Sequence, residues 1–105
     1  MRKLKFTVEG QRLRKDPKCD ISGVIPGSRH YLEAAFTFDG EWDKCVCVAE
    51  FRDDSNDIDA ALVEDGTCEI PASVLNEHNV YVRLIGKRAD GYCITTNQLQ
   101  ISQGG

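Results

Sequence analysis

The feature that most constrains this fold is an alternating apolar pattern over residues 32–38. Every second position carries an apolar side chain: Leu32, Ala34, Phe36 and Phe38. This period of two is typical of a β-strand that buries one face. The turn dipeptide Asp39-Gly40 comes next, followed by the only tryptophan, Trp42, which we expect to pack against this strand.

Similar patterns recur at short intervals and predict further strands at 3–8, 45–51, 58–62, 67–70, 79–86 and 94–101, with a short extension around Leu13. Pro71 favours one helical turn near 71–76. Asp-Gly pairs at 39–40, 65–66 and 90–91 indicate hairpin turns. The sequence therefore predicts one all-β domain over residues 1–105. We expect an antiparallel immunoglobulin-like two-sheet sandwich of seven or eight strands, with a small barrel as the alternative.

Residues 45–51 differ from the other predicted strands because they are almost uniformly apolar, with the sequence CVCVAEF. A strand of this composition is expected either to be buried on both sides or to be covered by a partner. The sequence leaves both alternatives open.

The five cysteines are odd in number and lack a C-x-x-C pair: Cys19, Cys45, Cys47, Cys68 and Cys93. We interpret them as reduced, mostly buried thiols that act as small hydrophobic residues. Two alternatives remain open. One is a zinc site, in which His30 or His78 completes a set begun by the Cys45-x-Cys47 pair; the other is a single disulfide.

The net charge of −4 is unevenly distributed, with +5 on residues 1–18 and −9 on the remaining 87 residues. Such a short basic part argues against nucleic-acid binding. No apolar run approaches the roughly 18 residues that a membrane-spanning helix needs, and no signal-peptide-like segment follows the basic start. We therefore expect synthesis in the cytoplasm and no membrane partner.

The motifs give no support for catalysis. Asp53, Ser55, Asp57 and Asp59, with Glu64, have the oxygen-ligand spacing of a calcium loop, but Ile58 stands where that loop needs glycine. The favoured interpretation is a solvated loop. We expect no enzymatic activity, no catalytic residues, no metal site and no cofactor.

Packing and turn residues along nearly the whole chain resemble a known family. They are Phe6-x-Val8-x-Gly10-Gln11, Tyr31-Leu32-x-Ala34-x-Phe36-x-Phe38, Trp42, Phe51, Cys68-x-Ile70-Pro71, Val80-x-Val82, Gly86 and Ile94-Thr95-Thr96-Asn97. This combination resembles small immunoglobulin-like sandwich proteins and modules of tailed-phage virions from Gram-positive and gut bacteria. The resemblance implies a role in the tail, the baseplate or capsid decoration, without catalytic residues.

The leading hypothesis is a non-enzymatic virion structural protein that docks onto other virion proteins or onto copies of itself, as a homo-oligomer within an assembly. It would reside in the host cytoplasm before assembly and in the virion afterwards. The expected contacts lie on the basic segment from Arg2 to Lys18 and on the long loop from Gly23 to His30. The residues named are Arg2, Lys3, Lys5, Arg12, Arg14, Lys15, Lys18, Arg29 and His30. The alternative is a small acidic phage-encoded inhibitor of a host defence or regulatory protein, which would use the acidic surface of residues 19–105.

Overall fold

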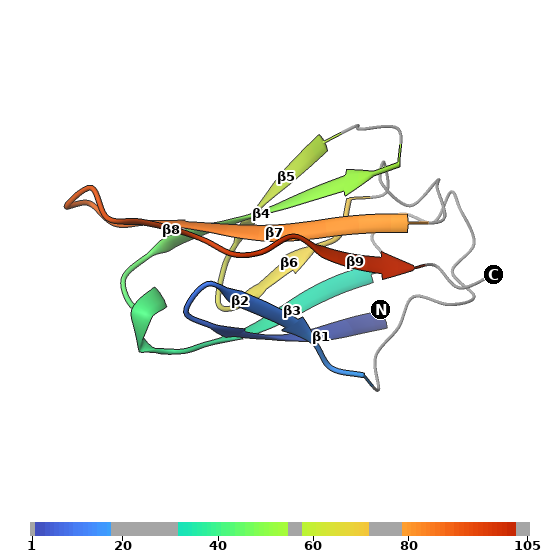
Figure 1. Ribbon diagram of the computed structural model, residues 1–105, viewed down its shortest axis with the longest axis horizontal. Helices are drawn as coiled ribbons and strands as arrows, with labels where there is room; N and C mark the ends of the chain where they lie inside the picture. The colour runs from blue at the N-terminus through green and yellow to red at the C-terminus, as the bar shows by residue number, and fades with distance from the viewer. Residues whose placement is uncertain (1, 18–31, 55–57, 72–78, 103–105) are drawn as a thin grey trace.

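The computed structural model describes residues 2–17, 32–54, 58–71 and 79–102 (Figure 1). Nine strands and one 3-10 helix lie within these ranges: β1 (Arg2–Glu9), β2 (Arg12–Lys15), β3 (Leu32–Phe38), η1 (Gly40–Trp42), β4 (Val46–Asp53), β5 (Ile58–Val63), β6 (Thr67–Glu69), β7 (Asn79–Lys87), β8 (Cys93–Thr95) and β9 (Leu99–Ser102). The helical turn predicted near 71–76 falls almost wholly outside the described residues.

The strands form two sheets that face each other, which confirms the predicted sandwich (Figure 1). One sheet has the order β2-β1-β3-β6. The five-stranded sheet has the order β5-β4-β7-β8, and β9 also pairs with β7. One pairing differs from the antiparallel prediction, because β1 and β3 run parallel. A parallel pair needs a long connection, and residues 10–31 separate β1 from β3 in the sequence.

The core lies between the inner faces of the two sheets. Alternate residues of the long strands point inward and are almost fully buried: Leu4, Phe6, Val8, Leu32, Ala34, Phe36, Ala49, Phe51, Val80, Val82 and Leu84. Phe6 and Phe36 occupy facing positions on β1 and β3 and stack at 5.1 Å between ring centroids. The alternating pattern in the sequence is thus the cause of the layered architecture.

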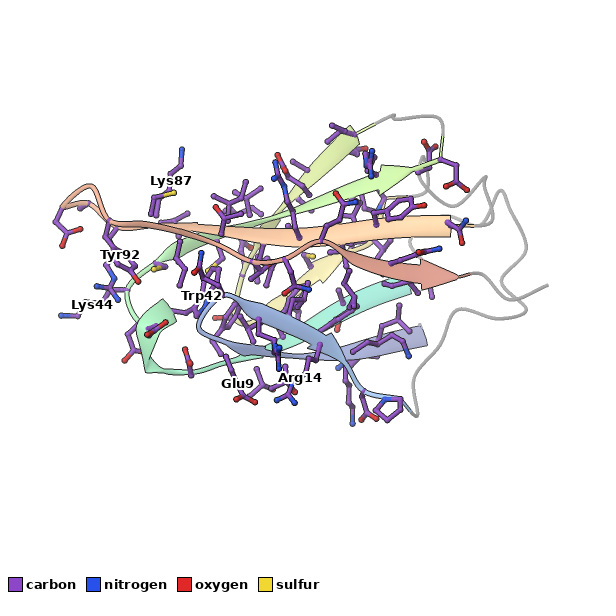
Figure 2. The ribbon with its side chains drawn as sticks, in the orientation of Figure 1. Glu9, Arg14, Trp42, Lys44, Lys87 and Tyr92 are labelled. Atoms are coloured by element: carbon purple, nitrogen blue, oxygen red, sulfur yellow. The ribbon has the colours of Figure 1, made fainter. Side chains whose placement is uncertain are left out.

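Trp42 connects the two sheets (Figure 2). Its indole Nε1 donates a 2.8 Å hydrogen bond to the carbonyl oxygen of Gly10, in the β1–β2 turn of the four-stranded sheet. The other side of the ring system lies against the backbone of Gly86 on β7. A Cβ atom at position 86 would lie 2.6 Å from Cζ3 of Trp42. Glycine is therefore required at position 86 because the indole occupies the side-chain space.

Asp39 places Trp42 by acting as a helix cap. Its carboxylate accepts a 2.8 Å hydrogen bond from the amide of Gly10 and a 3.1 Å bond from the amide of Glu41, at the start of η1. The prediction of a hairpin turn at Asp39-Gly40 is therefore wrong, since the chain here passes from β3 in one sheet to β4 in the other. Capping of the first backbone N–H groups is a common role of aspartate.

Of the other two Asp-Gly pairs, Asp90-Gly91 lies in a hairpin, as predicted, because β7 and β8 pair directly. The hairpin predicted at Asp65-Gly66 is wrong, because β6 pairs with β3 in the other sheet. Asp65 and Gly66, with φ angles of +54° and +77°, form a two-residue turn between the bridged residues Glu64 and Thr67. Gly91, with φ +95°, lies in the connection between β7 and β8. Positive φ at both central positions is the reason that Asp-Gly suits the shorter turn.

A second link between the sheets involves Asn97, between β8 and β9. The amide of Leu13 on β2 donates a 2.7 Å hydrogen bond to Asn97 Oδ1, and the amide of Asn97 donates to the carbonyl of Gln11. The preceding Thr96 maintains the pairing with β7, because its hydroxyl accepts a 2.9 Å bond from the amide of Leu84. The β2 edge of one sheet is therefore joined to the β8–β9 edge of the other.

The contact between Trp42 and Gly86 gives the first testable prediction. Gly86→Ala should lower the free energy of unfolding by about 1–3 kcal/mol, because the added methyl group overlaps the indole ring. Urea denaturation measures the change. Gly40→Ala is the matched control, because its Cβ atom would approach no closer than 3.9 Å to Asp43. Equal destabilisation by both variants would contradict the proposed packing.

Candidate docking surface on the five-stranded sheet

The basic residues predicted as contacts lie partly on one surface, the outer face of the four-stranded sheet. Lys3 and Lys5 on β1 and Arg12 and Arg14 on β2 are all exposed, opposite in direction to the buried core residues of these strands. The ammonium group of Lys15 donates a 3.1 Å hydrogen bond to the carbonyl of Asp16. The structure describes the backbone of Arg2 in β1 but not its side chain, and Lys18, Arg29 and His30 lie outside the described residues.

Acidic neighbours offset part of this positive charge. Arg14 forms an ion pair with Glu9, and Figure 2 shows the two side chains close together outside the four-stranded sheet. Lys3 forms a second ion pair with Glu33, at 3.4 Å between Nζ and Oε1. Exposed pairs of this kind contribute little stability. Their main effect here is that the basic segment presents a mixed surface of both signs.

The outer face of the five-stranded sheet carries an apolar patch, formed by Val46, Val48, Leu62 and Ile85. Val46 is 63% exposed and Leu62 is 52% exposed, whereas Val48 and Ile85 are half-buried. The patch members are neighbours because Val48 on β4 lies opposite both Leu62 on β5 and Ile85 on β7. A shallow depression of about 410 Å³ opens on this face, lined by Val46, Val48, Ile85, Lys87, Arg88 and Ala89.

Basic side chains border the apolar patch. Lys87 lies beside Val46 in the pairing of β7 with β4, and its side chain points away from the core (Figure 2). Arg88 bends toward η1, where its guanidinium donates to the carbonyls of Asp43 (3.0 Å) and Glu41 (2.8 Å). An apolar centre with a polar border is the usual arrangement of a protein–protein contact surface.

The other half of the same face is polar, and its side chains contact one another. Arg83 and Glu50 form an ion pair at 2.6 Å, and the guanidinium of Arg52 lies over the ring of Tyr81 at 4.8 Å. The Tyr81 hydroxyl donates a 3.0 Å hydrogen bond to Asp54, which raises the pKa of Tyr81. Because most of these polar side chains contact one another, the apolar half is the better candidate for contact with another molecule.

The sequence left open whether residues 45–51 are buried on both sides or covered by a partner, and the position of β4 tests the first alternative. Cys47, Ala49 and Phe51 on β4 are buried against the other sheet, but Val46 is exposed on the outer face. Burial on both sides is therefore wrong. Coverage of the outer side by a partner stays a prediction.

The edge strand β5 is the part of this surface that sequence reasoning missed. The alternation of Ile58, Ala60 and Leu62 predicts a strand, but the structure turns all three side chains outward, and Ile58 is 64% exposed. Ala61 and Val63 lie on the inner side and pack against the core. The period of two shows that the strand has two faces but does not show which one is buried.

The described thiols differ in burial, and Cys93 lies opposite Lys87 in the pairing of β7 with β8. Cys47 and Cys68 are buried, Cys45 is half-buried and Cys93 is exposed, and these four are free thiols; Cys19 lies outside the described residues. Burial, with a smaller effect of Glu33, raises the pKa of Cys68 to about 12. Burial, followed by the neighbouring Cys45, also raises the pKa of Cys47. Buried thiols are thus confirmed at positions 47 and 68.

The structure describes part of the segment whose acidic residues have the spacing of a calcium-binding loop. Asp53 is buried on the inner side of β4, whereas Asp59 is exposed on β5. Ser55 and Asp57 lie outside the described residues. Within the described ranges, no group of three or more His, Cys, Asp or Glu side chains is arranged to hold a metal ion.

No family model, no curated protein and no solved structure matches this chain. In the described part of the chain, no helix is long and apolar enough to cross a membrane. The candidate surface is therefore argued from its own geometry.

The raised pKa of Cys68 predicts slow labelling. At pH 8 a maleimide reagent should modify the exposed Cys93 first and Cys68 last, because Cys68 is buried and its thiolate is scarce at that pH. Peptide mass mapping over time measures the order, with the urea-unfolded chain as the control. Comparable rates for Cys68 and Cys93 in the native protein would contradict the assignment.

The same pKa shift has a consequence for stability. The unfolded chain releases the Cys68 proton near its ordinary pKa of 9.0, whereas the folded chain keeps it until about 12. The free energy of unfolding should therefore fall as the pH rises through this window, because the unfolded state binds fewer protons there.

Proposed function

We propose that this protein is a non-enzymatic structural subunit of a phage virion, in the tail, the baseplate or capsid decoration. It docks onto neighbouring virion proteins through the apolar patch on the outer face of the five-stranded sheet. The observation that carries this proposal is the exposure of Val46 and Leu62 on a sheet face whose remaining side chains are largely paired. The resemblance of the sequence to virion sandwich proteins supports the phage context.

The energetics favour covering this patch. Burial of a large aliphatic side chain contributes about 1.5–3 kcal/mol when it is fully removed from water, so Val46 and Leu62, both more than half exposed, would each contribute about 1 kcal/mol. The adjacent Val48 and Ile85 extend the contact, and Lys87 supplies charge at its border. In a symmetric assembly such a contact is repeated in every copy, so a modest affinity per site suffices.

The acidic inhibitor is the second candidate, and the charge arrangement favours it less. Glu33 and Glu50 are held in ion pairs with basic side chains of this chain, and Asp54 accepts hydrogen bonds from Asn79 and Tyr81. A surface that imitates nucleic acid needs acidic groups that are free to face a partner. Three of the available carboxylates are instead directed to internal contacts.

Incorporation into particles tests the proposed function. Tagged chains are expressed in the host during phage assembly, and quantitative mass spectrometry of purified virions measures copies per particle. Val46→Glu should reduce incorporation about tenfold or more, because it places a charge within the apolar patch. The fold should tolerate this change, because position 46 is exposed and lies next to Lys87.

Thr7→Glu is the matched control, since Thr7 is exposed on the outer face of the four-stranded sheet. Its incorporation should equal that of the unmodified chain. Absence of the unmodified chain from virions would contradict the proposal that it is a virion subunit. Loss of incorporation in Thr7→Glu with normal incorporation of Val46→Glu would assign docking to the basic face instead.

A further inference from the structure

The backbone groups on the outer edge of β5 can be assigned from the hydrogen bonds of its neighbours. On β7, the amide of Leu84 donates to the Thr96 hydroxyl and its carbonyl accepts from the Thr96 amide, so both groups point away from β4. Ala49 on β4, opposite Leu84, therefore directs its backbone groups toward Ala61 on β5. Successive residues of a strand point to opposite edges. Ile58, Ala60 and Leu62 consequently direct their N–H and C=O groups away from β4.

The turn between β5 and β6 gives the same assignment. Glu64 exchanges two backbone hydrogen bonds with Thr67, at 2.9 and 3.0 Å, on the side away from β4. Residues 62, 60 and 58 have the same parity as Glu64 and point to the same side. The bridge to Thr67 is isolated, and β6 continues into the other sheet, where it pairs with β3. β5 is thus the end strand of its sheet.

We propose that a second copy of this chain pairs antiparallel with β5 around a two-fold axis at Ala60. This inference goes beyond the proposed docking function, because it concerns the edge of β5 and not the outer face of the sheet. Ala60 would face its own counterpart, and Ile58 would face Leu62 of the partner in both directions. Each of these facing pairs exchanges two backbone hydrogen bonds, so the edge groups of all three residues are satisfied.

The side chains match in this register. Ile58 and Leu62 are the two strongly exposed apolar residues of β5, and the two-fold axis places each beside the other on the outer face. Val48 and Ile85 lie next to Leu62 in the same row of the sheet. Pairing therefore extends the apolar patch of one copy onto Ile58 of the other, as cross-strand pairs of aliphatic side chains favour.

Charge and hydrogen bonding disfavour the neighbouring registers. An axis at position 59 would place Asp59 directly opposite its counterpart, and like charges in facing positions are destabilising. An axis at position 61 would require Glu64 to pair with the partner, but its backbone groups already bond Thr67. With the axis at Ala60, Asp59 faces Ala61. The ion pair of Glu50 with Arg83 lies one strand further from the axis on each side.

The interface between the two β5 strands is small, so we expect the dimer to have a low affinity. A strand edge of this length buries less than the roughly 1,200 Å² of a stable interface, so the dimer should form at high protein concentration and dissociate on dilution. High local concentration in an assembly would favour it further.

Disulfide trapping tests both the partner and the register. In a Cys93→Ser background, Ala60→Cys places two thiols on facing residues whose Cα atoms are about 5.5 Å apart, within the range of a disulfide. Mild oxidation should give a covalent dimer. Ile58→Cys is the matched control, because it is equally exposed but would lie roughly 13 Å from its counterpart. The background protein without an added cysteine sets the baseline.

Cross-linking of Ala60→Cys at least about tenfold above that of Ile58→Cys supports the proposal. A covalent dimer of the double variant Ile58→Cys, Leu62→Cys supports it as well, because these two positions face each other across the axis. Equal cross-linking of both single variants, or none above baseline, overturns it. Sedimentation velocity of the natural chain is the second measurement: a concentration-dependent dimer that Leu62→Lys weakens about tenfold supports the inference. A monomer at every concentration contradicts it.

The outcomes separate this inference from the proposed function. Failure of dimerisation, with impaired virion incorporation of Val46→Glu, leaves docking intact and excludes a second copy as the β5 partner. If the chain forms the specific dimer but is absent from virions, the pairing at β5 is supported and the proposed virion function is excluded.

Discussion

The Trp42 indole, held between the two sheets, fixes the placement of the rest of the molecule. Its nitrogen donates to Gly10 on the side of the four-stranded sheet, and its ring occupies the side-chain space of Gly86 on β7. Asp39 holds both Gly10 and the start of η1, so the indole is positioned from two directions. Because the indole contacts both sheets, it fixes how the two inner faces lie against each other.

The two outer faces that remain are chemically different. On the four-stranded sheet, charged residues of both signs alternate and form ion pairs, which suits a solvated surface. The five-stranded sheet divides into a polar half with internal contacts and an apolar half around Val46 and Leu62. The apolar half borders β5, where the sheet ends. An apolar surface and open backbone groups therefore lie together, and each favours contact with another protein chain.

Most of the fold could be predicted from the sequence, because each long strand carries its own period-two pattern and Trp42 follows the most regular of them. The parallel pairing of β1 with β3 could not, because strand order depends on contacts between distant segments. The outward orientation of Ile58 and Leu62 was missed for a related reason. An alternating strand of small and apolar residues has two plausible inner faces, and only the register with β4 decides between them. The basic residues of β1 and β2 were identifiable as a group, but their acidic neighbours became apparent only in the structure.

The central claim is that, among the described strands, β5 ends its sheet and leaves its outer edge unpaired beside an apolar patch. Amide hydrogen exchange followed by NMR in dilute protein tests it directly, because it reports on individual N–H groups. The account predicts slow exchange for Ala61, whose amide faces β4, and fast exchange for Ala60 and Leu62, whose amides face outward. Protection of Ala60 and Leu62 equal to that of Ala61 would contradict the account, because it would mean that another part of the same chain covers this edge.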